Sequence, residues 1–298
     1  MYRDIEERYL GIKRALKALF DQRLTGRDRE SNSHNWHFLC HDHGEDMRLY
    51  HVNAGKFIYD MSSQELADLL EAVQGILDDY LLEGGEQNLW AMDYVVAEAQ
   101  RGTLEAFNNL SQQSQVYASQ TTLQQLLSSP GYLNQVAAAR LTTFSEWKVI
   151  SETARGDLTN IITDAVARGV NPRETASVIS KRLDVSMSKA KTIAQTEQVG
   201  SLRQAQWNET DWAADRLGLN TGLLHLSALK PTTRTTHAFW HGKVRTVQEV
   251  RDWYAVDGNK YHCYCSQIPV LLNDDGSIFN EGLADKLAKE RKAWDKVE

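Results

Sequence analysis

The sequence contains no run of 18 or more apolar residues, and its first residues lack the apolar stretch of a secretory signal peptide. We therefore expect a protein without membrane-spanning helices that is made and kept in a cytosol-like compartment. Proline and cysteine are also scarce, with four and three residues in 298. Few prolines favour helices, and three cysteines, two of them one residue apart, do not form a disulfide framework.

Clustered positive charge is missing as well. No run of Lys or Arg exceeds two residues, and the formal net charge is −7. A protein that binds duplex DNA needs clustered basic side chains to displace counterions from the phosphates, so we do not expect sequence-specific DNA binding. The chain also lacks the phosphate-binding loop, the dinucleotide-binding glycine motif and the nucleophile elbow of common enzyme classes. These absences predict a protein that is not an enzyme.

Helical patterns dominate the first 220 residues. Apolar residues recur at helical spacing over residues 3–24. Ser62 and Glu65 have the spacing of a capping box at the start of a second helix. Further helices are expected over 89–110, over 133–168 with Gly169 as its C-cap, as a short helix from Pro172, and from an N-cap at Ser186 to Leu217.

The pattern changes after Gly222. Two short strands are predicted at 223–229 and 266–272. A helix is expected between them over 247–253, and a charged amphipathic helix over 283–297. We therefore predict a mainly α fold, in which a long-helix N-terminal region is followed by a smaller α+β domain with a short sheet.

The last third of the chain gathers residues of the kinds that bind zinc. Cys263 and Cys265 are one residue apart, and His237 and His241 are spaced i, i+4, so these four could bind a structural zinc ion. The spacing is not that of a zinc finger, and no metalloprotease or deaminase motif supplies a general base. The alternative interpretation is that no cofactor binds, that both cysteines are small buried apolar side chains, and that the histidines bond to backbone in loops.

A second group of histidines lies in a polar segment near the N-terminus: His34, His37, Cys40, His41, His43 and His51. Zinc or nickel could bind such residues, but the segment has no regular pattern that implies ligand geometry. A surface loop or an intersubunit contact, with histidines that respond to pH near neutrality, is the favoured interpretation.

Four motifs follow one another between about residues 150 and 272. They are a helix that ends in Gly169, a helix that carries Thr196-Glu197, a segment from Arg234 to His237, and a closing Cys263-Tyr264-Cys265. This order resembles the head morphogenesis family of tailed phages that is named after the F protein of phage Mu. Its members are also called minor head or minor capsid proteins.

The sequence departs from the family pattern in its charged residues. Gln195 stands where the family has arginine, and Thr232 where it has aspartate. Trp240-His241-Gly242 replaces a Leu-Asp-Gly turn, and Tyr264 replaces a second arginine. The missing charges favour a structural role for the motif in this chain. We predict that Thr196, Glu197 and Arg234 form this structural motif, in which a buried Glu197–Arg234 ion pair ties the helix to the loop.

The resemblance implies three parts. Residues 1–130 would be a helical N-terminal region that docks on partners, 131–272 an independently folding Mu F-like α+β domain, and 273–298 a C-terminal amphipathic helix or tail. It also implies a structural minor head protein that is assembled in the host cytoplasm and lies in the virion, inside the head near the portal vertex. There it would assist head assembly, DNA packaging or ejection.

The implied partners are the portal protein, the major capsid protein or both, and further copies of the chain itself. Packaged DNA would lie nearby without sequence-specific binding, and no membrane is involved in the head. The alternative function, from a different class, is a zinc-dependent hydrolase or nuclease that uses the His237, His241, Cys263 and Cys265 cluster.

Overall fold

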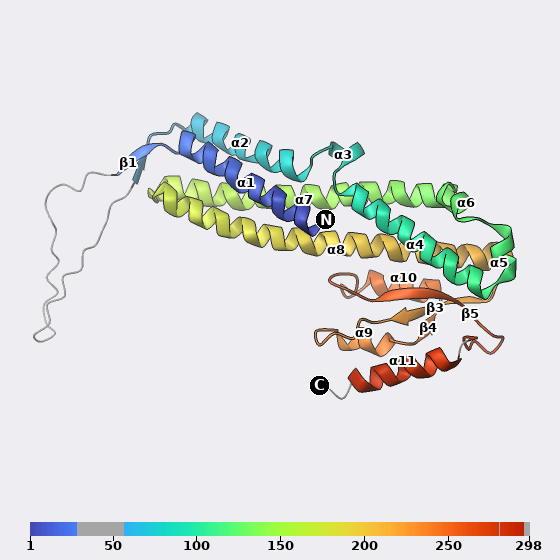
Figure 1. Ribbon diagram of the computed structural model, residues 1–298. Helices are drawn as coiled ribbons and strands as arrows, with labels where there is room; N and C mark the ends of the chain where they lie inside the picture. The colour runs from blue at the N-terminus through green and yellow to red at the C-terminus, as the bar shows by residue number, and fades with distance from the viewer. Residues whose placement is uncertain (29–56, 280, 295–298) are drawn as a thin grey trace, which may run out of the picture. The chain divides into compact units, whose positions relative to one another are not determined.

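The computed structural model describes residues 1–28, 57–279 and 281–294 (Figure 1). The predicted histidine group of residues 34–51 lies outside them. The helices are α1 (Tyr2–Arg23), α2 (Ser63–Leu81), α3 (Gly85–Asn88), α4 (Met92–Gln113), α5 (Gln115–Gln120), α6 (Leu123–Leu127), α7 (Pro130–Arg168), α8 (Pro172–Leu217), α9 (Thr235–Trp240), α10 (Val247–Ala255) and α11 (Glu281–Trp294). The strands are β1 (Gly26–Asp28), β2 (Phe57–Tyr59), β3 (Thr221–Leu226), β4 (Val244–Arg245) and β5 (Ser266–Leu271).

The mainly α prediction is confirmed, since 73% of the structure is helical and the larger sheet lies near the C-terminus. The chain divides into two compact units. Unit 1 comprises residues 1–2, 84–146 and 190–298, and unit 2 comprises 3–83 and 147–189. The long helices α7 and α8 contribute to both.

Unit 2 is a bundle of α1, α2 and the parts of α7 and α8 that belong to it. The expected apolar stripe of α1 is buried, and the predicted capping box is present, because Ser62 accepts from the Glu65 N–H and Glu65 accepts from the Ser62 N–H. Trp147 of α7 is fully buried in this unit. The pair β1–β2 is attached to the turn between α7 and α8, where the Phe57 N–H donates to the Gly169 carbonyl at 2.9 Å.

The expected helix start at Ser186 is wrong. Helix α8 is continuous from Pro172 to Leu217, so the short helix predicted from Pro172 and the long helix predicted from Ser186 are one. A serine can cap a helix or lie within one, and the side-chain partner decides which. The Ser186 hydroxyl lies 2.7 Å from the hydroxyl of Tyr9 on α1. It therefore joins two helices of the bundle.

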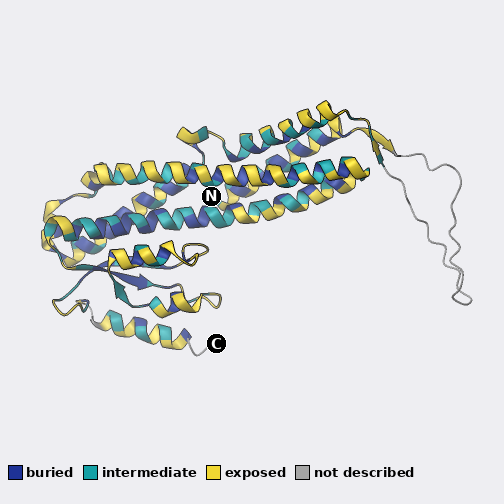
Figure 2. Ribbon diagram, turned by 180° about the vertical axis from the view of Figure 1, so that it is seen from behind, coloured by how far each residue is buried: buried dark blue, intermediate teal, exposed yellow. Residues whose placement is uncertain are grey.

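Unit 1 contains a three-stranded antiparallel sheet in the order β4–β3–β5. Four of the six residues of β3 are buried (Figure 2). Successive side chains of a strand point to opposite faces. Accordingly, Leu223 belongs to a core cluster with α8 and α10, while Leu224 packs with Leu287 of α11. The two predicted strands are confirmed with ends shifted by at most three residues, and the two-residue β4 was not predicted.

Helices α4 and α5 complete the core of unit 1. Leu110 of α4 and Tyr117 of α5 cluster with Ala213 of α8 and Leu271 of β5. The Gln113 side chain bonds to β5 twice, since its amide donates to the Pro269 carbonyl at 3.1 Å and its oxygen accepts from the Leu271 N–H at 2.9 Å. The proposed boundary at residue 130 stays a prediction, but α4 and α5 share a core with the sheet that follows it.

Glycine at position 102 allows α4 and α8 to approach closely. A Cβ there would lie 2.3 Å from the Leu202 carbonyl oxygen and 3.0 Å from the Ala205 Cβ. We expect Gly102→Ala to lower the free energy of unfolding by about 1–3 kcal/mol, because the helices must separate. Gly200→Ala, in α8 and with nothing within 4 Å of the added carbon, should raise it by up to about 1 kcal/mol. Urea unfolding measures both, and equal stability of the two variants would contradict this packing.

Candidate functional site

Three of the four predicted zinc ligands meet in unit 1. The Nδ1 atom of His237 lies 3.3 Å from the sulfur of Cys263 and 3.4 Å from that of Cys265. His237 comes from α9 and the cysteines from the turn that leads into β5. All three side chains are buried, with 2 to 4% of their surface exposed. The ligand atoms of this His–Cys–Cys group lie within 4.8 Å of one another.

His241 does not join this group. Its Nδ1 accepts a hydrogen bond from the Ser227 N–H at 3.0 Å, and its Nε2 lies 3.2 Å from the Glu290 carboxylate of α11. The i, i+4 spacing places two histidines on one face only where the helix continues through both. Helix α9 ends at Trp240, and His241 has ψ near 125°. Its side chain therefore points away from the face of His237.

A buried arginine fixes the turn that carries the cysteines. Arg203 of α8 has 1% of its surface exposed. Its guanidinium donates to the Cys265 carbonyl at 2.9 and 2.7 Å and to the Cys263 carbonyl at 3.1 Å, and it lies 4.4 Å from the centre of the Tyr254 ring. Sequence analysis missed this residue. The sequence offered one signal of its burial. Arg203 is spaced i, i+4 from Trp207, so the two residues share a face of α8, and Trp207 is buried as well.

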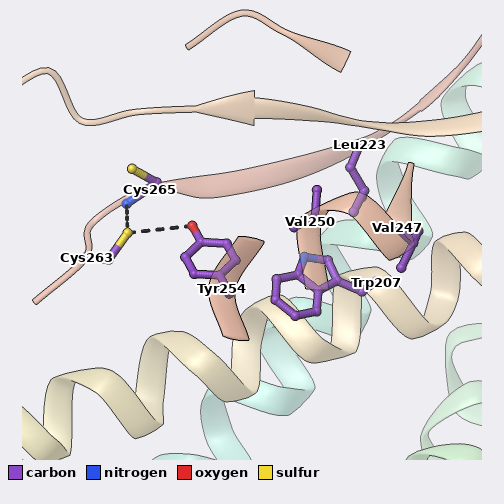
Figure 3. Close-up of a cluster of buried hydrophobic side chains, with 7 residues drawn as sticks. All are labelled: Trp207, Leu223, Val247, Val250, Tyr254, Cys263 and Cys265. Carbon is purple, nitrogen blue, oxygen red and sulfur yellow. Dashed lines mark hydrogen bonds between the residues drawn. The ribbon is translucent and has the colours of Figure 1, made fainter. Parts of the chain in front are cut away.

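A buried network of polar side chains continues from this arginine. Gln267 donates to the Tyr254 hydroxyl at 3.1 Å and accepts from the Trp207 indole N–H at 3.1 Å. Its amide nitrogen also lies 3.1 Å from His225 Nδ1. Burial lowers the pKa of His225 to about 3, so the imidazole is neutral at pH 7. The network orients Tyr254, whose oxygen points to the sulfur of Cys263 (Figure 3).

The two thiols differ in acidity because they share a hydrogen bond. The Cys265 thiol donates to the sulfur of Cys263, which lowers the pKa of Cys263 and raises that of Cys265. His237 and the charge of Arg203 lower the pKa of Cys263 further. Cys263 is therefore the more acidic of the two thiols.

Residues 157–268 match the family model described as Phage Mu protein F like protein. This segment is similar to the phage Mu F-like family. The match confirms the resemblance inferred from the motifs, and the family indicates a structural protein of phage head morphogenesis. No curated protein and no solved structure matches the chain. No helix among residues 1–28, 57–279 and 281–294 is long and apolar enough to cross a membrane.

The Mu F-like segment includes Arg203, the His–Cys–Cys group and the predicted motif of Thr196, Glu197 and Arg234. Thr196 bonds within its own helix, to the Thr192 carbonyl at 2.9 Å. Arg234 is exposed. It donates to three carbonyls of the following loop, those of Gly258, Asn259 and Tyr261, at 2.9 to 3.1 Å.

The predicted Glu197–Arg234 ion pair is therefore wrong, because the guanidinium is used by the backbone of the 258–261 loop. Arg234 instead holds this loop against the start of α9. Glu197 remains half-buried in the Mu F-like segment. Burial raises its pKa, the charge of Glu146 adds to the rise, and Lys260 opposes it.

The raised pKa of Glu197 predicts a pH-dependent cost in stability. A carboxyl whose folded pKa exceeds its unfolded pKa destabilises the fold as the pH rises through the folded value. We expect Glu197→Gln to be more stable than the wild type at pH 7, and the difference to vanish below about pH 4, where the carboxyl is protonated in both states. Denaturant unfolding at the two pH values measures this. Glu152→Gln, at a carboxylate that is 59% exposed, should show no such difference.

Proposed function

We propose that this protein is a minor head protein of a tailed phage that associates with the portal protein on the inside of the head and assists head assembly. The observation that carries the proposal is the family match over residues 157–268. The family supports a head protein in the virion. The finer elements, namely the portal as partner and a part in packaging or ejection, are proposed from the resemblance, and the surface described next supports the portal contact.

An apolar stripe on α7 suits a docking surface. Leu133, Ala137 and Leu141 are spaced i, i+4 and i+8, so they share one face of the helix, and all three are exposed. The two leucines have 55% and 58% of their surface exposed. Amphipathic helices bind partners through apolar residues at this spacing. We call this set the α7 stripe and propose that it contacts the portal protein.

The double variant Leu133→Glu, Leu141→Glu should bind the portal protein more weakly by a factor of about ten or more, because each glutamate would bury a charge in the interface. The double variant and the wild type are co-expressed with the portal protein of the same phage, and the complex is quantified after affinity purification. The control variant carries Asn134→Glu and Thr142→Glu, which add the same charge to neighbouring exposed positions of α7.

Equal losses in the two variants would contradict a role for the α7 stripe. Binding of the major capsid protein instead of the portal would identify the other implied partner. Mass spectrometry of full and emptied virions tests the wider proposal, since a head protein must be present in full particles. Absence of the chain from purified virions would remove the proposed function.

The zinc-dependent hydrolase or nuclease has no observation of its own in favour. A catalytic zinc needs a general base within reach. Among the described residues, the His–Cys–Cys group includes no carboxylate. The acids of nearby α10 have other partners, since Glu249 caps the helix through Thr246 and Asp252 accepts from Gln248.

A further inference from the structure

We propose that His237, Cys263 and Cys265 bind one zinc ion, which joins α9 to the turn before β5 as a structural link. The proposal does not depend on the function in the phage head. It corrects the four-ligand set expected from the sequence, because His241 is used elsewhere.

The distances within the His–Cys–Cys group match those of a zinc tetrahedron. Zinc binds sulfur at about 2.3 Å and imidazole nitrogen at about 2.0–2.1 Å, so a tetrahedral nitrogen–sulfur edge is about 3.6 Å. The two observed edges from His237 Nδ1 are 3.3 and 3.4 Å. Changes of a few tenths of an ångström would bring these two edges to the tetrahedral value, and the three ligand atoms already lie within 4.8 Å of one another.

Polar groups of the surrounding residues lie close to the two sulfurs. The Cys265 N–H points to the sulfur of Cys263 at 3.4 Å, and the Tyr254 hydroxyl lies 3.6 Å from the same atom (Figure 3). The Ser227 side chain bonds to Cys265. The positive charge of Arg203 is held beside both residues by their carbonyl groups. Such donors around metal-bound sulfur orient the ligands and stabilise their charge.

The orientation of the His237 ring points the same way. A histidine can bind a metal through either Nδ1 or Nε2. Nδ1 faces the two sulfurs, while Nε2 is buried without a hydrogen-bond partner, and the ring lies edge-on to Trp253 with centres 4.5 Å apart. The ring therefore presents Nδ1 to both sulfurs, which is the position from which it would bind the same ion.

The ligand types select the metal and its role. Two thiolates and an imidazole favour zinc over the hard cations magnesium and calcium. Binding releases the remaining thiol protons to solvent. The described residues supply no fourth His, Cys, Asp or Glu to the group, so the fourth position is assigned to a water molecule. Burial of all three ligands and the lack of a carboxylate make the ion a link between segments.

Zinc content of the full chain, purified without chelators and measured by plasma mass spectrometry, tests the proposal. We expect about one zinc per chain in the wild type, which should fall by about tenfold in Cys265→Ser and in His237→Gln. The matched controls His241→Gln and Cys40→Ser should keep the zinc. His241 bonds elsewhere, and Cys40 belongs to the separate histidine-rich segment of the sequence.

A second measurement does not require the ligand variants to fold. A chelator should lower the Tm of the wild type by about 5–15 °C, and added zinc should restore it. In the cobalt-substituted protein, thiolate-to-cobalt charge-transfer absorption should appear and should persist in Cys40→Ser.

Three results would overturn the proposal. They are zinc well below one per chain with a Tm that chelators do not change, zinc that is lost only in Cys40→Ser, and a Cys263–Cys265 disulfide in the peptide map of the unreduced protein. None of these results bears on the presence of the chain in virions, so the structural link and the head function can fail separately.

Discussion

Methionine in place of Arg203 is expected to lower the free energy of unfolding by about 3–5 kcal/mol, because two buried carbonyls lose their charged donor. The three hydrogen bonds from Arg203 connect α8 to the two cysteines before β5. Methionine has a similar length and preserves most of the apolar packing against Tyr254. The loss of unfolding free energy therefore measures the contribution of the hydrogen bonds and the charge, and not that of the apolar packing.

Arg251→Met is the matched control. Arg251 of α10 bonds to Asp211 of the same α8 at 2.6 Å, but the two side chains are 32% and 38% exposed. Exposed ion pairs contribute about 0–1 kcal/mol, so this variant should lose no more than that. Urea unfolding followed by circular dichroism compares the two. Similar losses of unfolding free energy in the two variants would mean that the buried Arg203 stabilises the fold no more than the exposed Arg251 does.

Near-ultraviolet circular dichroism offers a second readout for Arg203→Met. Trp207 and Tyr254 stack with ring centres 5.6 Å apart, and Trp240 and Trp253 with centres 4.6 Å apart. These rings surround the turn that Arg203 fixes. Their signal should weaken in Arg203→Met below the unfolding transition and stay unchanged in Arg251→Met.

Local signals in the sequence predicted most of the helices. The Ser62–Glu65 box and the Gly169 end depend on short-range chemistry, and the structure has both. Ser186 shows the limit of such signals. Its hydroxyl bonds to Tyr9 across the bundle, a contact that depends on how α1 and α8 pack.

The candidate site was predictable in its residue types but not in its geometry. Cysteine and histidine are recognisable in a sequence, so three of the four proposed ligands are in the group that the structure forms. The end of α9 at Trp240, which turns His241 away, has no strong sequence signal. Arg203 and Arg234 were missed or misassigned for one reason, which is that their partners are backbone carbonyls. Every residue has a carbonyl, so no residue type marks such a partner.

A fragment that begins at residue 131 is expected not to fold cooperatively, although the resemblance implied an independent domain from that position. The fragment loses Leu110 and Tyr117, both fully buried against α8 and β5. It also loses Gln113, which bonds to the backbone of β5. Glu209 would lose the Tyr117 hydroxyl that donates to it, and a buried carboxyl without a partner costs about 1–3 kcal/mol or more.

Thermal unfolding and NMR spectra of fragment 131–298 measure the outcome. Co-expression with residues 1–130 is the control, because it returns α4 and α5 without the covalent bond and should restore a folded complex. A sharp unfolding transition of the fragment alone, near the Tm of the intact chain, would contradict the shared core.

If the fragment does not fold, a loss of portal binding on truncation would show only that the fragment is unfolded. Point charges on the α7 stripe then become the decisive test of docking, since Leu133 and Leu141 are exposed and their replacement leaves the core of unit 1 in place.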